Sequence, residues 1–134
     1  MLFSDVLANK LKKLRVSVHM TQDDVALLLG MNRTSFSKYE NGAANPPLSV
    51  LRKLAKLYSV PIEFLIHDDI SVSVVENADS YEMLDEGEIE EQVSMFFSKL
   101  TPEERMIVLK MRLLNEEDRE KIIEQINNSF ENGV

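Results

Sequence analysis

Hydrophobic residues recur every three or four positions along most of the chain, which is the spacing of a helix with one buried side. The first stripe runs through residues 3 to 18 and consists of Val6, Leu7, Leu11, Leu14 and Val18. Four shorter stretches follow at 22–29, 33–40, 47–58 and 61–66, with a proline expected at the first position of the fourth helix, Pro47. Five helices with apolar sides within about 66 residues predict a compact all-α domain.

The turn between the second and third helices is specified from both sides. Thr21 is a good N-cap for the second helix, and Asp24 three residues later completes a capping box. Gly30 ends this helix, where we expect a positive φ, and Asn32 caps the third helix. The Asn-Gly pair at 41–42 then stops the third helix. These signals predict two short helices joined by a tight turn.

The third helix has two chemically opposite sides. Phe36 and Tyr39 form one of them. The other side spans roughly 140° at about 100° per residue. Its residues are Arg33, Thr34, Ser37 and Lys38. A helix held by aromatic residues that shows a basic and hydroxylic side has the form of a helix that reads base edges in the major groove of DNA.

The net charge of −8 argues at first against nucleic acid, but the charge is unevenly spread. Residues 1–70 hold nine Lys and Arg against seven Asp and Glu, which gives +2, whereas residues 71–134 hold six against sixteen, which gives −10. Fields at 0.15 M salt fade over about 8 Å, so a local basic surface can bind phosphate on an acidic chain. Whether Lys10, Lys12 and Lys13 contact DNA or only aid solubility stays open.

The C-terminal half carries further helical signals after a candidate boundary. We expect residues 69–80 to be a linker or a short edge strand, because Ile70, Val72 and Val74 alternate with polar residues. Residues 81–134 then form a small helical region. Helix starts are expected at Thr101-Pro102-Glu103-Glu104 and at Asn115, and the last helix carries Ile122, Ile123 and Ile126. Such short helices must pack on each other, on the first domain or on another chain.

Several elements in order identify a family resemblance. Gln22, Ala26 and Gly30 are followed by apolar residues at 36 and 39, by YENG and by the pattern P-x-L-x-x-L-x-K-L-A-K-L-Y-x-V-P. Over residues 9–66 the chain resembles the lambda-repressor-like (Cro/repressor, XRE) helix-turn-helix family. The resemblance implies a five-helix DNA-binding domain over residues 1–68, followed by a helical C-terminal region at 81–134 for dimerisation or partner binding.

The resemblance also implies roles for individual residues. Gln22 and Asn41 would contact phosphates, with Gln22 also bracing the third helix, whereas Arg33, Thr34 and Lys38 would meet base edges with Ser37 nearby. An ion pair between Arg15 and Glu40 would be structural. The loop after the third helix departs from many relatives because residues 43–47 carry no charge. Fewer phosphate contacts weaken binding by one domain, so we expect a homodimer reading half-sites about 34 Å apart.

The sequence therefore predicts a DNA-binding transcriptional regulator, specifically a dimeric repressor that reads an inverted repeat in double-stranded DNA. The alternative is an antitoxin-like or antirepressor-controlled regulator whose acidic C-terminal helices bind another protein. We expect no enzyme activity, no catalytic residues, no metal site and no cofactor, because His19 and His67 lie far apart without carboxylates that would form a reactive cluster. The absence of Cys suits a cytoplasmic protein, and no apolar run predicts a membrane span.

Overall fold

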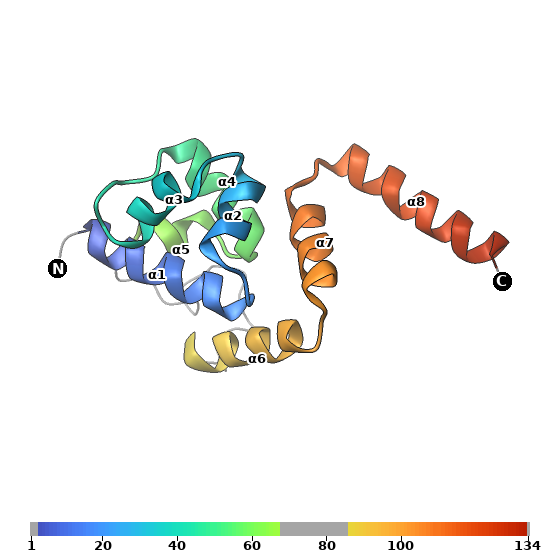
Figure 1. The fold of residues 1–134 in the computed structure, drawn as a ribbon, viewed down its shortest axis with the longest axis horizontal. Helices are drawn as coiled ribbons and strands as arrows, with labels where there is room; N and C mark the ends of the chain where they lie inside the picture. The colour runs from blue at the N-terminus through green and yellow to red at the C-terminus, as the bar shows by residue number, and fades with distance from the viewer. Residues whose placement is uncertain (1–2, 68–85, 134) are drawn as a thin grey trace.

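The computed structural model describes residues 3–67 and 86–133, and within these two ranges every regular element is a helix (Figure 1). The helices are α1 (Phe3–Ser17), α2 (Gln22–Leu29), α3 (Arg33–Glu40), α4 (Leu48–Tyr58), α5 (Ile62–Ile66), α6 (Glu86–Ser98), α7 (Pro102–Leu113) and α8 (Glu116–Asn132). The predicted all-α fold class is confirmed. We call α1 to α5 the head. The expected linker or edge strand at residues 69–80 lies outside the described residues, so the domain boundary there stays a prediction.

Side-chain caps fix the starts of four of the described helices, α2, α3, α7 and α8. The hydroxyl of Thr21 accepts from the backbone N–H of Asp24, and the Asp24 carboxylate accepts from the N–H of Thr21, which forms the predicted capping box. Thr101 and Glu104 form the same arrangement at α7, with Pro102 as the first helical residue. The side chain of Asn115 caps α8. Each cap satisfies N–H groups that a helix leaves without an internal partner.

The start of α4 differs by one residue from the prediction. Pro47 is the N-cap, with φ −64° and ψ 162°, and Leu48 is the first helical residue. The proline ring fixes φ at a value that suits both the N-cap and the first helical position, but it does not fix ψ. An extended ψ therefore leaves Pro47 outside the helix, and the expectation that it would occupy the first helical position was wrong.

The head has one core to which all five helices contribute. α1 packs against α3 and α5, α2 packs against α3, and α4 packs against α5. The side chains at its centre are almost completely buried: Leu7, Leu11, Val25, Phe36, Leu54, Leu57 and Leu65. Leu7 and Leu11 belong to the stripe predicted for the first helix, and Phe36 belongs to the apolar side predicted for the third. In α4, Leu57 is buried together with Leu51, Leu54 and Tyr58, so this helix is covered over a wide arc.

The C-terminal helices α6 and α7 pack on the head, which was one of the three arrangements left open by the sequence. α6 lies against α1, and α7 lies against α4 (Figure 1). Phe97 and Leu109 are buried in the same core as the head's apolar residues. The guanidinium of Arg112 donates from Nη1 to the carbonyl oxygen of Leu57 at 2.8 Å and lies 5.4 Å from the centroid of the Phe97 ring. This cation thus joins α7 to the end of α4, and burial lowers its pKa.

The last helix, α8, extends away from the rest of the molecule (Figure 1). None of its residues is buried. Ile123, Ile126 and Phe130 are 42%, 58% and 74% exposed. An amphipathic helix of this length gains most of its stability from packing of its apolar side. Within the part of the chain that the structure describes, the apolar side of α8 has no such packing. Among the described helices, none is long and apolar enough to cross a membrane.

Candidate nucleic-acid interface

The turn between α2 and α3 is held by backbone geometry. Gly30 adopts φ 72° and ψ 31°, as predicted, and its N–H bonds the carbonyl of Leu27. Met31 N–H then bonds the carbonyl of Ala26 at 3.0 Å. A Cβ on Gly30 would meet no atom within 4 Å, so the left-handed conformation, and not a lack of space, is what favours glycine here. The small buried Ala26 lies beside this turn on α2 and allows α3 to pack closely.

Two aromatic residues fix the rotation of α3 about its own axis. Phe36 is completely buried, and the half-buried Tyr39 meets it edge-on, with ring centroids 6.4 Å apart and an angle of 86° between the ring planes. The Asn32 side chain accepts from the N–H of Ser35 at 2.8 Å and fixes the start of the helix. Because both the start of α3 and its rotation about its own axis are fixed, the side of α3 opposite Phe36 points in a defined direction.

The opposite side of α3 faces solvent. Arg33, Thr34 and Lys38 are exposed and Ser37 is half-buried. Among the described residues, none of these four side chains forms a hydrogen bond or an ion pair with another part of the chain. The basic and hydroxyl groups of this side are therefore available to a ligand. We call these four residues the α3 reading face.

A buried carboxylate ties α3 to the two preceding helices. Glu40, the last residue of α3, pairs with Arg15 of α1 through two contacts, Nε to Oε2 at 2.8 Å and Nη2 to Oε1 at 3.0 Å. Gln22 at the start of α2 donates from Nε2 to Glu40 Oε1 at 3.1 Å. The side chains of Arg15 and Glu40 are only 13% and 2% exposed. Arg15 also donates to the carbonyl of Met20 at 2.8 Å, so one cation fixes both the α1–α2 loop and α3.

A buried tyrosine lies close enough to this ion pair to respond to both of its charges. Tyr58 is 5% exposed, and its hydroxyl is the one buried side-chain polar atom among the described residues without a hydrogen-bond partner. Burial raises the pKa of Tyr58, the Glu40 charge raises it further, and the Arg15 charge offsets part of that increase. The hydroxyl therefore stays neutral. Because the Glu40 carboxylate is itself buried, it depends on Arg15 and Gln22 for its stabilisation.

The residues that follow α3 are only partly exposed and are ordered by local hydrogen bonds. Asn41 caps the helix end, and its Oδ1 accepts from the N–H of Ala43 at 2.9 Å. The carbonyl of Lys38 accepts from both Ala43 and Ala44. This leaves the Asn41 amide N–H₂ group directed to solvent or a ligand. The loop at 43–47 adds no charge beside the reading face.

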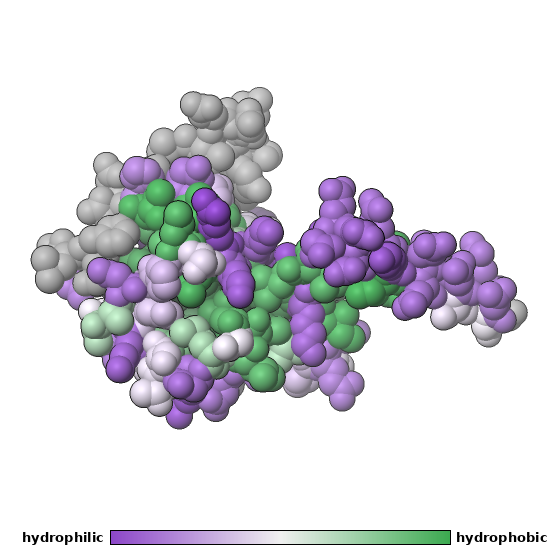
Figure 2. Space-filling model, turned by 90° about the horizontal axis from the view of Figure 1, so that it is seen from above, coloured by the Kyte–Doolittle hydropathy of each residue, from purple (hydrophilic) through white to green (hydrophobic). Residues whose placement is uncertain are grey.

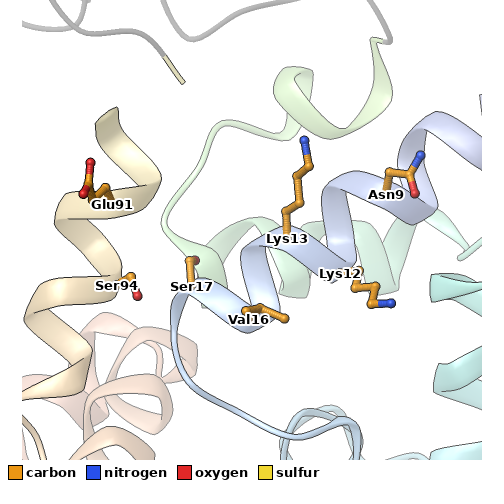
Figure 3. Close-up of a pocket in the computed structure, with 7 residues that line it drawn as sticks. All are labelled: Asn9, Lys12, Lys13, Val16, Ser17, Glu91 and Ser94. Carbon is orange, nitrogen blue, oxygen red and sulfur yellow. The ribbon is translucent and has the colours of Figure 1, made fainter. Parts of the chain in front are cut away.

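The three lysines of α1 have different surroundings. The ammonium of Lys10 donates to the carbonyls of Phe64, at 2.7 Å, and His67, and lies 4.9 Å from the centroid of the Phe64 ring. Lys10 therefore joins α1 to α5. Lys12 and Lys13 are exposed and line a groove of about 620 Å³ between α1 and α6 (Figure 3). Nothing in the sequence distinguished Lys10 from its two neighbours, since its acceptors lie more than fifty residues away.

Comparison with known proteins agrees with this geometry. A family model described as "Helix-turn-helix" matches residues 11–65, a range that contains α2, the turn and α3. Among curated proteins, the phage transcriptional repressor RstR of Vibrio cholerae is 35% identical over 86 residues, which are 62% of this chain and 78% of the relative. The chain belongs to the lambda-repressor-like helix-turn-helix family.

Other relatives of the chain are also described as transcriptional regulators. An uncharacterized HTH-type regulator of Methanocaldococcus jannaschii is 40% identical over 63 residues, which cover 46% of this chain and 96% of the relative. The transcriptional activator BcrR of Enterococcus faecalis is 33% identical over 67 residues, half of this chain and 33% of the relative. No solved structure gives a significant match.

The family and the exposed α3 together establish a DNA-binding transcription regulator, so the predicted resemblance and this general function are confirmed. The relatives include a repressor and an activator, and therefore they do not give the sign of regulation. The comparisons do not test the contacts assigned to Gln22, Asn41 and the reading face. These contacts stay predictions.

Proposed function

We propose that the protein is a dimeric repressor that reads an inverted repeat, with α3 of each copy in the major groove of double-stranded DNA. The observation that supports this proposal most directly is the α3 reading face, which is exposed and without side-chain partners while the other side of α3 is buried through Phe36. A helix presented in this way fits the width of the major groove.

Base contacts are assigned from the chemistry of the reading face. Arg33 and Lys38 can donate to O6 and N7 of guanine, and Arg33 can do so with two parallel hydrogen bonds. Thr34 offers a methyl group to thymine and a hydroxyl to a hydrogen-bonding edge. Ser37 is half-buried and can reach only a nearby edge or a bridging water.

Phosphate contacts are assigned to the two ends of the motif. Gln22 uses one N–H of its amide for Glu40, and the second N–H remains for a phosphate oxygen. Asn41 has its oxygen engaged by Ala43, so its amide N–H₂ group is the donor. Arg15 neutralises Glu40 beneath these contacts, which prevents a buried negative charge from repelling the DNA backbone.

The proposed dimer compensates for the small number of phosphate contacts that each head offers. Each phosphate neutralised by a cation adds about 0.9 to the slope of log affinity against log salt. The uncharged loop at 43–47 adds nothing to that slope. Two heads on half-sites about 34 Å apart would double the contacts and read a symmetric site.

The test is selection of DNA from a random duplex library by the full chain and by Arg33→Ala. We expect the native chain to select an inverted repeat and Arg33→Ala to lose discrimination at one base position in each half-site. This loss corresponds to about 1–3 kcal/mol per good contact. Arg52→Ala, which removes an exposed arginine from α4, is the control and should leave the selected sequence unchanged. An unaltered site preference in Arg33→Ala would refute the assignment of readers.

The exposed apolar side of α8 also fits the second candidate, an antitoxin-like or antirepressor-controlled regulator that is bound there by another protein. In that case the purified chain would stay monomeric and would form a stable complex only with the product of a neighbouring gene. The oligomeric state of the purified chain separates the two candidates.

A further inference from the structure

Positively charged side chains gather in a pocket where the end of α4 meets α7 and the start of α8. The pocket has a volume of about 410 Å³, and three of the residues that line it are cations: Lys56, Arg112 and Arg119. Among the described residues that line it, none is Asp or Glu. Seen from above, hydrophilic residues gather over the start of α8, where this helix leaves the rest of the molecule (Figure 2). Three like charges thus share one pocket in a chain whose net charge is −8.

The carboxylates nearest to this pocket in the sequence are in the first turn of α8, and they do not line it. Glu117 pairs with Lys121 of its own helix at 3.2 Å. The Asp118 carboxylate accepts from the side-chain amide of Asn115 at 3.1 Å. Glu116 forms no ion pair with a described residue. The chain therefore does not neutralise the three cations from this turn.

The three cations also have unused hydrogen-bond donors. Arg112 is held in place by one bond, from Nη1 to the carbonyl oxygen of Leu57, and by the ring of Phe97. Its other N–H groups have no acceptor in the described part of the chain, and burial lowers its pKa because the charge is poorly solvated. Lys56 and Arg119 are exposed, and within residues 3–67 and 86–133 their side chains form no hydrogen bond or ion pair. An anion would find donors that are available and, at Arg112, fixed in position.

The end of α4 does not account for all three cations. A cation near a helix C-terminus can donate to the last carbonyl groups of the helix. In α4 the carbonyls of residues 55, 56 and 57 already accept hydrogen bonds, from Val60, Ser59 and Arg112 respectively. Only Arg112 has this role, so the side chains of Lys56 and Arg119 are available to a ligand.

We propose that this pocket binds a small-molecule phosphomonoester, whose phosphate group lies among Lys56, Arg112 and Arg119. A phosphomonoester carries about −1.5 to −2 charges at pH 7, which suits a site with three cations. The planar guanidinium groups can each offer two parallel N–H donors to phosphate oxygens, whereas Lys56 acts as a point charge. The exposed hydroxyl of Ser59 is a further donor in the lining.

The rest of the lining favours a ligand with a small apolar body. Ala55, Val60 and Leu114 form this part of the pocket. The volume of about 410 Å³ lies within the range of about 300–1,000 Å³ that is typical of small-molecule sites, and a phosphate group alone would leave much of it empty. A phosphate ester of a small organic molecule fits both the charge and the volume.

The pocket joins two parts of the molecule that otherwise make little contact. Lys56 belongs to the head, and Arg119 belongs to α8, which has no buried residue. A phosphate bound by both cations would restrain the direction of α8 relative to the head. In Figure 1, α3 and α7 lie apart, on different sides of the head. The inference therefore goes beyond the proposed function and does not rest on how α3 reads DNA.

The first test is a two-dimensional ¹H–¹⁵N NMR titration of the full chain at about 0.15 M salt, with phenyl phosphate, inorganic phosphate and phenol as separate probes. We expect phenyl phosphate to bind at one saturable site at least tenfold more tightly than inorganic phosphate, and phenol not to bind. The largest shifts should be at the backbone amides of Val60 and Leu114. An absence of saturable binding, or equal binding of the two phosphates, would overturn the proposal.

Two variants separate a built site from general attraction between charges. Arg119→Glu and Lys110→Glu each replace an exposed positive charge by a negative one, but only Arg119 lines the pocket. Lys110 lies two residues before Arg112 and so about 200° away around α7. Arg119→Glu should weaken binding of phenyl phosphate at least tenfold, and Lys110→Glu should weaken it less than twofold. Equal losses in the two variants would overturn the proposal. Far-ultraviolet circular dichroism checks that both remain helical.

A phosphate could also come from the DNA backbone, and a competition experiment distinguishes the two sources. If phenyl phosphate and the duplex selected by the native chain bind together, and Arg119→Glu leaves duplex affinity unchanged, the small-molecule site is supported. If the duplex displaces phenyl phosphate and Arg119→Glu weakens duplex binding, the pocket holds DNA and this inference is overturned, while sequence reading by α3 still stands. If phenyl phosphate binds the pocket but the chain prefers no DNA sequence, the proposed function is the one that fails.

Discussion

Helices α3 and α8 are both amphipathic, but they use their two sides in opposite ways. In α3 the apolar side is buried within the chain through Phe36, and the polar side is left open. In α8 the apolar side is open, with Phe130 74% exposed, and no residue is buried. The comparison shows that amphipathic spacing predicts a helix but does not say which side will meet a partner. The packing of the rest of the chain decides that.

We expect the largest difference in the free energy of unfolding when one aromatic residue of each helix is replaced by alanine. Phe36→Ala should lower the free energy of unfolding by about 3–5 kcal/mol, because it leaves a cavity beneath α3. Phe130→Ala should change it by less than about 0.5 kcal/mol when measured at a concentration where the chain is monomeric. Urea titrations followed by circular dichroism measure both. Equal losses in the two variants would contradict the distinction between the helices.

The ion pair beneath α3 should give the next largest effect. Arg15→Met leaves the buried Glu40 carboxylate uncompensated, and we expect a loss of about 3 kcal/mol in the free energy of unfolding. The double variant Arg15→Met/Glu40→Leu should recover much of this loss, since no unpaired charge remains. The same urea titrations measure all variants of this cycle. If the loss in the double variant equals the sum of the losses in Arg15→Met and Glu40→Leu, the two residues are not coupled and the pair does not fix α3.

Gln22→Ala tests whether Gln22 positions the protein on DNA without contributing to the recognition of its sequence. It removes a hydrogen bond to Glu40 and a proposed phosphate contact. We expect DNA binding to weaken by about 1–3 kcal/mol for every sequence alike. Fluorescence anisotropy with the selected site and with an unrelated duplex measures both affinities. A change in relative preference between the two duplexes would mean that Gln22 reads sequence.

The smallest effects are expected when the N-cap residue of α2 and the N-cap residue of α8 are each replaced by alanine. Thr21→Ala removes the cap of α2 and should lower the global free energy of unfolding by about 1 kcal/mol. Asn115→Ala removes the cap of α8 and should instead reduce the helix content of the monomer with little change in global unfolding. Hydrogen exchange resolves the two regions. A global loss from Asn115→Ala would show that α8 folds together with the head.

The features of the head that depend on short stretches of sequence were predictable. Thr21, Gly30 and Asn32 act within three or four residues of their own positions, and the aromatic anchors of α3 follow from helical spacing. The start of α4 was misplaced by one residue because the proline at 47 fixes φ and leaves ψ free. The exposure of the reading face followed from the same spacing, although its contacts with DNA are still predictions.

Contacts between distant segments could not be predicted in the same way. The sequence marked Phe97 and Leu109 as apolar, but it did not show that they pack into the core of the head. Arg112 donates to a backbone carbonyl 55 residues away, and every residue has such a carbonyl, so no side chain marks the acceptor. The third member of the Arg15–Glu40 network, Gln22, was expected to brace α3, but its acceptor became clear only in the structure.

The most direct measurement is site-directed photo-cross-linking of the full chain to its selected duplex. Because the chain has no cysteine, Ser37→Cys can carry a single photoreactive group on the α3 reading face, and Lys121→Cys can carry it on the charged side of α8. The proposals predict that the group at residue 37 cross-links to bases in the major groove at two positions about 10 base pairs apart, and that the group at residue 121 does not cross-link. Cross-links from residue 121 but none from residue 37 would contradict them.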